Sequence, residues 1–249
     1  MKHSPLAAAL LTIVLVACNT QGQIPGNSTS SSSSSTQSTS AAVSAASIAT
    51  SAAPAASSKA APTGNVQMKL PFASQAPLGN WDPPYDEACE EASLILVNAY
   101  LNGQGMSANE MNTQILDVVA WEEGKGYPID VTIPQLLEIA KGKYNLNGRV
   151  IENVTIEDIK NELRNGNPVI APFAGRDLGN PYYSGLGPWY HVMVITGFDG
   201  TYFYTKDVGT KRGDNYKYTH ATLFNALHDW TGVKEETNTG PKRVLVVTK

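Results

Sequence analysis

The chain has 249 residues, of which 42% are hydrophobic and 8% aromatic, a composition that excludes a wholly disordered protein. Lys2 and Lys59 are the only formally charged residues before residue 60, which leaves 16 basic against 22 acidic residues afterwards, a net charge of −6. Because this part of the chain is acidic and has no block of basic residues, a nucleic-acid partner is not expected.

The N-terminus has the pattern of an export signal. Lys2 precedes an apolar stretch from Leu6 to Val16, too short to span a membrane, which predicts a signal peptide over residues 1–17. The run Leu15-Val16-Ala17-Cys18 resembles the bacterial lipoprotein cleavage signal. The resemblance implies cleavage before Cys18, a lipid on its sulfur, and an extracytoplasmic protein anchored in the bacterial cell envelope. An ordinary signal peptide with an incidental cysteine is the alternative.

A low-complexity tract follows the signal. Of the 31 residues from Ser28 to Ser58, 27 are Ser, Thr or Ala. Such a segment buries too little apolar surface to offset its chain entropy, so residues 18–65 are predicted to be a disordered tether. Everything that can fold lies in residues 66–249, which suffice for one domain with a good core.

The first half of this domain is predicted to be mostly helical. Apolar residues recur at helical spacing after Cys89, and prolines exclude a helix just before it. Ser107, Thr132 and Thr155 each stand where a helix should begin, and the first two have the spacing of a capping box. The third helix should end near Lys141, and the fourth near residues 165–166.

In the second half of the domain, the pattern of apolar residues becomes typical of β-strands. Residues 168–173 and 191–196 are apolar runs separated by a Gly- and Tyr-rich loop over 174–189. Asp199-Gly200 predicts a hairpin whose second strand covers residues 201–205. A helix over 219–230, carrying His220 and His228 on one face, and a last strand over 243–248 complete the chain. Helices followed by antiparallel strands indicate an α+β fold.

Three residues in this pattern have the chemistry of a nucleophile, a base and an orienting group. If Cys18 carries a lipid, Cys89 is a leftover thiol in an exported protein, at the start of a helix whose positive end favours a thiolate. Neighbouring glutamates act against that charge. His191 opens a strand after the long loop, and Asp207 lies about as far after the hairpin turn as His191 lies before it, so the two could be cross-strand neighbours.

The same residues carry a resemblance to a known family. Pro71 to Pro77, Cys89-Glu90-Glu91-Ala92-Ser93 and the strand from His191 to Asp199 resemble the papain-fold cysteine peptidases related to the double-glycine leader peptidases of bacteriocin exporters. The resemblance implies a papain-like fold with N-terminal helices packed on a C-terminal antiparallel sheet. It also implies Cys89 as nucleophile, His191 as general base and acid, and Asp207 as orienter, although the family's third motif is an Asn-Asp-Pro run of which this chain keeps only the Asp.

The resemblance further implies an upstream Gln that binds the oxyanion. Gln75 is the matching residue, and because it precedes Cys89 by more than in the family's compact members, Asn80 is an alternative. No cofactor is expected. No metal is expected either, because the sequence has no Cys pair and no His pair at i, i+4.

The sequence therefore predicts a membrane-anchored cysteine peptidase that hydrolyses amide bonds in a peptide or protein substrate. Two other readings stay open. One is a different acyl-transfer enzyme of the same fold, such as a peptidoglycan amidase or a transglutaminase-like protein. The other is a catalytically silent module that binds peptides, an alternative that the acidic residues around Cys89 keep open.

Overall fold

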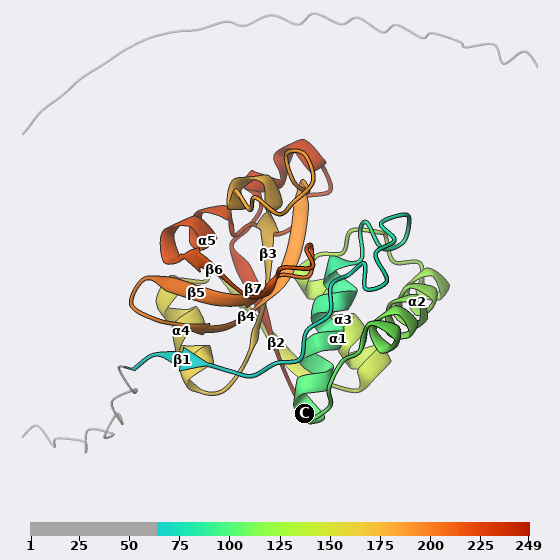
Figure 1. The fold of residues 1–249 in the computed structure, drawn as a ribbon, viewed down its shortest axis with the longest axis horizontal. Helices are drawn as coiled ribbons and strands as arrows, with labels where there is room; N and C mark the ends of the chain where they lie inside the picture. The colour runs from blue at the N-terminus through green and yellow to red at the C-terminus, as the bar shows by residue number, and fades with distance from the viewer. Residues whose placement is uncertain (1–63) are drawn as a thin grey trace, which may run out of the picture. The chain divides into compact units, whose positions relative to one another are not determined.

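A computed structural model describes residues 64–249 (Figure 1). The predictions made for the signal peptide (1–17), for Cys18 and for nearly all of the tether (18–65) lie outside the described residues. The first strand of the described part is β1 (Val66–Gln67). None of the helices in residues 64–249 is long and apolar enough to cross a membrane.

The helices of the first half begin where the capping residues predict. Ser107 Oγ accepts a hydrogen bond from the backbone N–H of Glu110, and the Glu110 carboxylate accepts one from the backbone of Ser107. Thr155 caps the fourth helix in the same way, whereas at the start of the third helix the Gln135 side chain accepts from the backbone N–H of Thr132 at 2.8 Å. The helices are α1 (Cys89–Leu101), α2 (Ala108–Lys125), α3 (Ile133–Tyr144) and α4 (Ile156–Arg164).

Within the described residues, seven strands form one antiparallel sheet, so the predicted α+β class is confirmed. The order is β2-β7-β3-β4-β5-β6, and β1 pairs with β4. The bounds are β2 (Asn147–Glu152), β3 (Val169–Ala174), β4 (Tyr190–Phe198), β5 (Tyr202–Lys206), β6 (Asp214–Thr219) and β7 (Arg243–Thr248).

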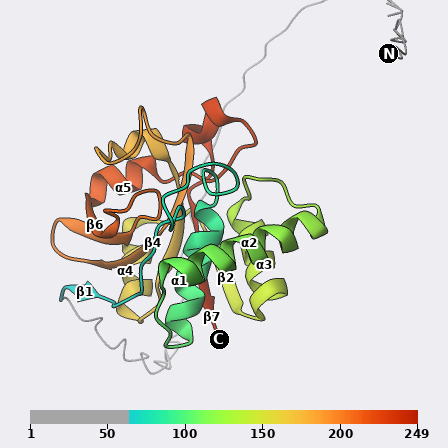
Figure 2. The same ribbon diagram turned by 45° about the vertical axis from the view of Figure 1, so that its right-hand side comes forward.

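Both faces of the central strands are buried, which explains their uninterrupted apolar runs. Along β3 and β4, Ile170, Val192 and Val194 pack under α1, α2 and α3. The alternate residues Met193 and Ile195 pack on the other face with α4 and α5 (His220–Ala226). Helix α1 lies directly against the sheet, with α2 and α3 beside it (Figure 2). The helix carrying Cys89 is thereby fixed to β4.

Two parts of the sequence prediction need correction. Strands β1, β2 and β6 are not among the predicted strands, because each depends on pairing with a neighbour, β4, β7 or β5, more than on its own apolar pattern. Helix α5 ends at Ala226, so His228 is not on it. His228 instead donates its Nδ1–H to the Gly240 carbonyl at 2.7 Å. Short 3₁₀ turns occupy Gly175–Leu178 and Lys234–Thr239.

Candidate active site

Cys89 is the first residue of α1 and is joined to strand β4. Its sulfur accepts a hydrogen bond from the backbone N–H of Val192 at 3.2 Å. One turn later, Ser93 Oγ donates to the Val192 carbonyl at 3.1 Å. These two side chains bind both polar backbone groups of the residue that follows His191. The Cys-x-x-x-Ser spacing therefore fixes the sulfur at the start of the histidine strand.

His191 and Asp207 form a buried pair. The Nε2 atom of His191 lies 2.9 Å from Asp207 Oδ1, and the side chains are 2% and 0% exposed. The equal distances of His191 and Asp207 from the hairpin turn predicted that the two residues lie close together. They are not, however, a directly opposed cross-strand pair. Lys206 pairs with Val194, so Asp207 follows the end of β5 and reaches His191 diagonally.

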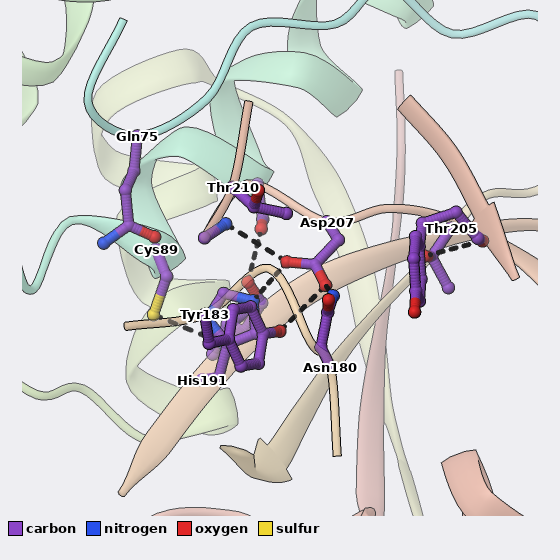
Figure 3. A network of polar contacts seen from close by, with 12 residues as sticks. Gln75, Cys89, Asn180, Tyr183, His191, Thr205, Asp207 and Thr210 are labelled. Atoms are coloured by element: carbon purple, nitrogen blue, oxygen red, sulfur yellow. Dashed lines mark hydrogen bonds and ion pairs between the residues drawn. The ribbon is translucent and has the colours of Figure 1, made fainter. Parts of the chain in front are cut away.

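Asp207 is held by side chains that the sequence analysis did not single out. Its Oδ2 atom accepts hydrogen bonds from Asn180 Nδ2 at 2.9 Å, Tyr183 OH at 2.8 Å and Tyr218 OH at 2.6 Å. Figure 3 shows Asn180 and Tyr183 around the Asp207 carboxylate. Burial would raise the pKa of Asp207, but His191 and the two tyrosines outweigh it and lower that pKa. The carboxylate is thus held in its charged form.

Two glycines allow this close packing. A Cβ atom on Gly209 would lie 2.8 Å from His191 Cε1, and one on Gly213 would lie 1.7 Å from the Asp207 carbonyl oxygen. The Gly209 N–H also donates to Asp207 Oδ1 at 3.1 Å. Glycine is therefore required where the loop after β5 passes the histidine ring. The only sequence signal for this loop was the run from Lys206 to Gly209.

A cavity of about 350 Å³ brings the candidate residues together. Cys89, His191 and Gln75 line it, together with Tyr183 and other residues of the 174–189 loop. In Figure 3 the Cys89 sulfur lies at the start of the strand that carries His191, and its dashed line marks the hydrogen bond from the Val192 N–H. Asn80 does not line this cavity; its Oδ1 accepts from the backbone N–H of Asp82 in an exposed turn.

In the side-chain amide of Gln75, only the nitrogen forms hydrogen bonds within the described residues. Its Nε2 donates to the backbone carbonyls of Tyr85 and Asp86 at 2.9 and 3.1 Å, while its buried Oε1 has no partner within residues 64–249. Its backbone N–H donates to the Val208 carbonyl at 2.9 Å, next to Asp207. Donation to an oxyanion therefore requires Nε2 to exchange one of its two carbonyl partners.

The electrostatics at the sulfur favour a thiol. Burial raises the pKa of Cys89 well above its usual range, and the negative charge of Glu90 adds to the rise. The Cys89 thiol donates to Glu90 Oε2 at 3.0 Å, while Glu90 Oε1 accepts from the N–H of Val131. The expected effect of the helix terminus is therefore outweighed, and the resting state holds a protonated sulfur.

No group of three His, Cys, Asp or Glu side chains in residues 64–249 could hold a metal ion. The arrangement that the described residues do provide is a thiol, an imidazole and a buried carboxylate along one cavity. This is the set that nucleophilic acyl transfer uses.

The chain is similar in fold to a solved structure. The chain is similar in structure to a putative C39-like peptidase from Bacillus anthracis, with a TM-score of 0.50, 14% identity, and coverage of 74% of this chain and 98% of that one. A double glycine motif protease from an AMS/PCAT transporter, solved in complex with its leader peptide, gives a TM-score of 0.42 at 18% identity, covering 75% and 98%. No curated protein matches the chain significantly in sequence.

The family model named Peptidase_C39 like family matches residues 67–237, which include Gln75, Cys89, His191 and Asp207. The match spans more than half of the chain and nearly all of the described part. The chain belongs to the Peptidase_C39 like family.

Proposed function

We propose that the protein is a cysteine peptidase in which Cys89, His191 and Asp207 hydrolyse an amide bond of a peptide or protein. The observation that carries the proposal is the shared cavity of Cys89 and His191, with His191 bound to a buried, charged Asp207. Membership of a peptidase-like family supports the reaction type.

The reaction follows from the positions of the groups. Because Nε2 of His191 is bound to Asp207, Nδ1 is the nitrogen that takes the thiol proton. The Cys89 thiolate then attacks the carbonyl carbon, and the tetrahedral intermediate collapses as the carbon–nitrogen bond breaks. The amine leaves with the proton from His191. Water, deprotonated by His191, next cleaves the thioester to a carboxylic acid and regenerates the thiol.

Asp207 and the Cys89 backbone complete the mechanism. Asp207 fixes the tautomer of His191 and stabilises the imidazolium that forms. The Cys89 N–H, at the start of α1, is one donor for the oxyanion, and Gln75 Nε2 is the second after it exchanges a carbonyl partner.

A catalytically silent peptide-binding module is the second candidate. The hydrogen bond from the Cys89 thiol to Glu90 and the raised pKa of that thiol favour it, because an inert sulfur needs no activation. In the peptidase, by contrast, the thiol has to turn from Glu90 to His191 when substrate binds. The two candidates therefore differ in the reactivity of one atom.

Covalent labelling with peptide mapping distinguishes them. The full chain is treated with a labelled, broad cysteine-peptidase inactivator, and the modified residue is identified by mass spectrometry. We expect label on Cys89, with none after His191→Ala or in Cys89→Ala, and hydrolysis abolished in Cys89→Ala while the fold is retained. Unchanged turnover in Cys89→Ala would remove the peptidase, and binding of peptides without labelling of Cys89 or hydrolysis would favour the binding module.

We also propose, from the sequence of residues 1–65, that Cys18 carries a lipid and that the domain is held outside the cytoplasm by a flexible tether. The run Leu15-Val16-Ala17-Cys18 and the Ser/Thr/Ala-rich segment after it support this location. Metabolic labelling with an alkynyl fatty acid in a bacterial host should mark the wild-type chain and not Cys18→Ser. Equal labelling of both would refute lipidation at Cys18.

A further inference from the structure

A second cavity, of about 340 Å³, adjoins the catalytic cleft, and Asp86 lines both. Its acidic residues come from the turn before α1, from the first turn of α1 and from the end of α2. They are Asp86, Glu87, Glu91, Glu122 and Glu123. Only Glu87 forms an ion pair within residues 64–249, with Lys234 at 3.1 Å. Five acidic side chains therefore line one cavity next to the reactive sulfur, and only one of them is paired with a cation in the described residues.

Two of these carboxyl groups are buried without a donor. Glu91 is 3% and Glu122 is 5% exposed. Glu91 Oε2 and Glu122 Oε1 accept no hydrogen bond from any N–H or O–H group in the described residues, and the two carboxyls are close enough to share a proton. Burial raises the pKa of Glu122 to about 7, and the nearby Glu90 adds to that rise. A buried pair of this kind is stabilised either by a shared proton or by an external cationic donor.

The rest of the cavity lining is apolar, and this favours a cationic side chain over a metal ion as the ligand. Pro84, Val119 and Ile129 form part of the wall, and Ile129 is 74% exposed. A lysine or arginine side chain has an apolar stem and a cationic end, and so matches both parts of the lining. A bare metal ion does not, because no group of three ligating side chains is assembled there or elsewhere in residues 64–249.

We propose that this second cavity is a subsite for a lysine or arginine side chain of the polypeptide substrate, whose cationic end binds Glu91 and Glu122. This inference rests on the proposed peptidase function, since it assigns a substrate class to that site. The bound cation supplies the hydrogen-bond donors that the two carboxylates lack and displaces their shared proton. Its stem covers Ile129 and the adjoining apolar wall.

Binding is tested first, without catalysis. The full chain with Cys89→Ala is titrated with n-butylguanidinium chloride and with the uncharged n-butylurea, and amide shifts are followed by NMR. We expect saturable binding of the cation alone, with shifts centred on Glu91, Glu122 and Ile129. The Glu91→Gln/Glu122→Gln pair should weaken it by about tenfold or more, as expected for loss of a charge-assisted hydrogen bond.

Control variants keep the binding test decisive. Asp177→Asn changes an exposed carboxylate outside the cavity and should leave the affinity unchanged. If the buried pair does not fold as amides, Glu123→Lys places an opposing charge on an exposed rim position and should weaken binding as well. Equal binding of the urea, equal affinity in all variants, or binding of Ca²⁺ in place of the guanidinium would overturn the proposal.

Hydrolysis is tested separately. Wild-type enzyme is given matched peptides in which one position carries lysine or the isosteric, uncharged norleucine, and each position near the scissile bond is scanned in turn. We expect kcat/KM to favour lysine by about tenfold at one position, and Glu123→Lys to abolish that preference. Cleavage without any such preference overturns the subsite alone. Guanidinium binding without cleavage of any peptide overturns the peptidase and leaves the cation site standing.

Discussion

Replacing Asp207 with alanine should damage both stability and turnover, for separable reasons. The carboxylate accepts five hydrogen bonds: Oδ2 binds Asn180, Tyr183 and Tyr218, and Oδ1 binds His191 and the Gly209 N–H. In Asp207→Ala the buried tyrosine hydroxyls lose this acceptor, although Asn180 keeps its bond to Tyr218 at 2.8 Å.

The size of the effect follows from these contacts. A hydrogen bond to a charged group contributes about 1.5–3 kcal/mol, and part of each loss is recovered because the cost of burying the carboxylate also disappears. We therefore expect Asp207→Ala to lower the free energy of unfolding by about 3–5 kcal/mol and Tm by about 10 °C. Loss of the orienting group should reduce kcat by about 10²–10⁴-fold, less than the loss in Cys89→Ala.

Asp207→Asn separates the two effects. Its amide oxygen can still accept from His191, so we expect a stability loss of about 1–2 kcal/mol and a smaller loss of kcat than in Asp207→Ala. Urea unfolding and peptide hydrolysis are measured on both variants and on Asp177→Ala, whose carboxylate is exposed. Unfolding free energies within about 0.5 kcal/mol of wild type in Asp207→Ala would refute the reasoning, as would full activity.

The pH dependence provides an internal check. The folded-state pKa of Asp207 is lowered, so its contribution to stability is present above the pKa of the unfolded chain and is lost as pH falls through the folded value. The stability difference between wild type and Asp207→Ala should therefore be constant near neutrality and shrink in acid. A difference that grows as pH falls would contradict the assigned sign.

Three further predictions concern the groups around the sulfur. Gln75→Ala should lower kcat by about 10²-fold, whereas Asn80→Ala should leave it unchanged; the reverse result would move the oxyanion donor to Asn80. Glu90→Gln should lower the pKa of Cys89, seen as a shift of the alkylation rate–pH profile to lower pH, because the Glu90 charge that opposes ionisation of the thiol is removed; an unchanged rate–pH profile would refute it. Glu122 has a folded-state pKa of about 7, above that of the unfolded chain, so its contribution is complete below pH ~4.5 and is lost as pH rises through 7. Between these pH values the free energy of unfolding of the wild type, measured with urea, should fall by up to about 3 kcal/mol relative to that of Glu122→Gln. The same pH dependence of this free energy in both proteins would contradict the prediction.

Local sequence signals located the helices and the hairpin because each has a short-range cause. The capping side chains of Ser107 and Thr155 bond to the backbone three residues on, and the Asp199 carboxylate binds the N–H groups of Thr201 and Tyr202 at the hairpin turn. Strands β2 and β6 had no comparable signal, since polar residues such as Asn147 and Lys217 become strand only by pairing with β7 and β5.

The site was predictable in its central residues but not in their surroundings. Cys89, His191 and Asp207 could be found from spacing because the hairpin and the helix start fix them locally. Tyr183 and Tyr218 are separated by 35 residues, and they converge on one oxygen only because the long loop folds over the sheet. Nothing in a loop's composition states which of its tyrosines will meet a carboxylate.

The acidic residues around the nucleophile join the catalytic and binding proposals. Glu90 accepts a hydrogen bond from the Cys89 thiol in the resting state, and Glu91, the next residue, lines the second cavity with Glu122. Negative charge near the sulfur raises its pKa, so a cation entering that cavity reduces the opposition to thiolate formation. A basic substrate side chain would then favour both its own binding and the transfer of the thiol proton to His191. On this argument, the Glu-Glu pair after Cys89 makes the thiol least reactive when the subsite is empty.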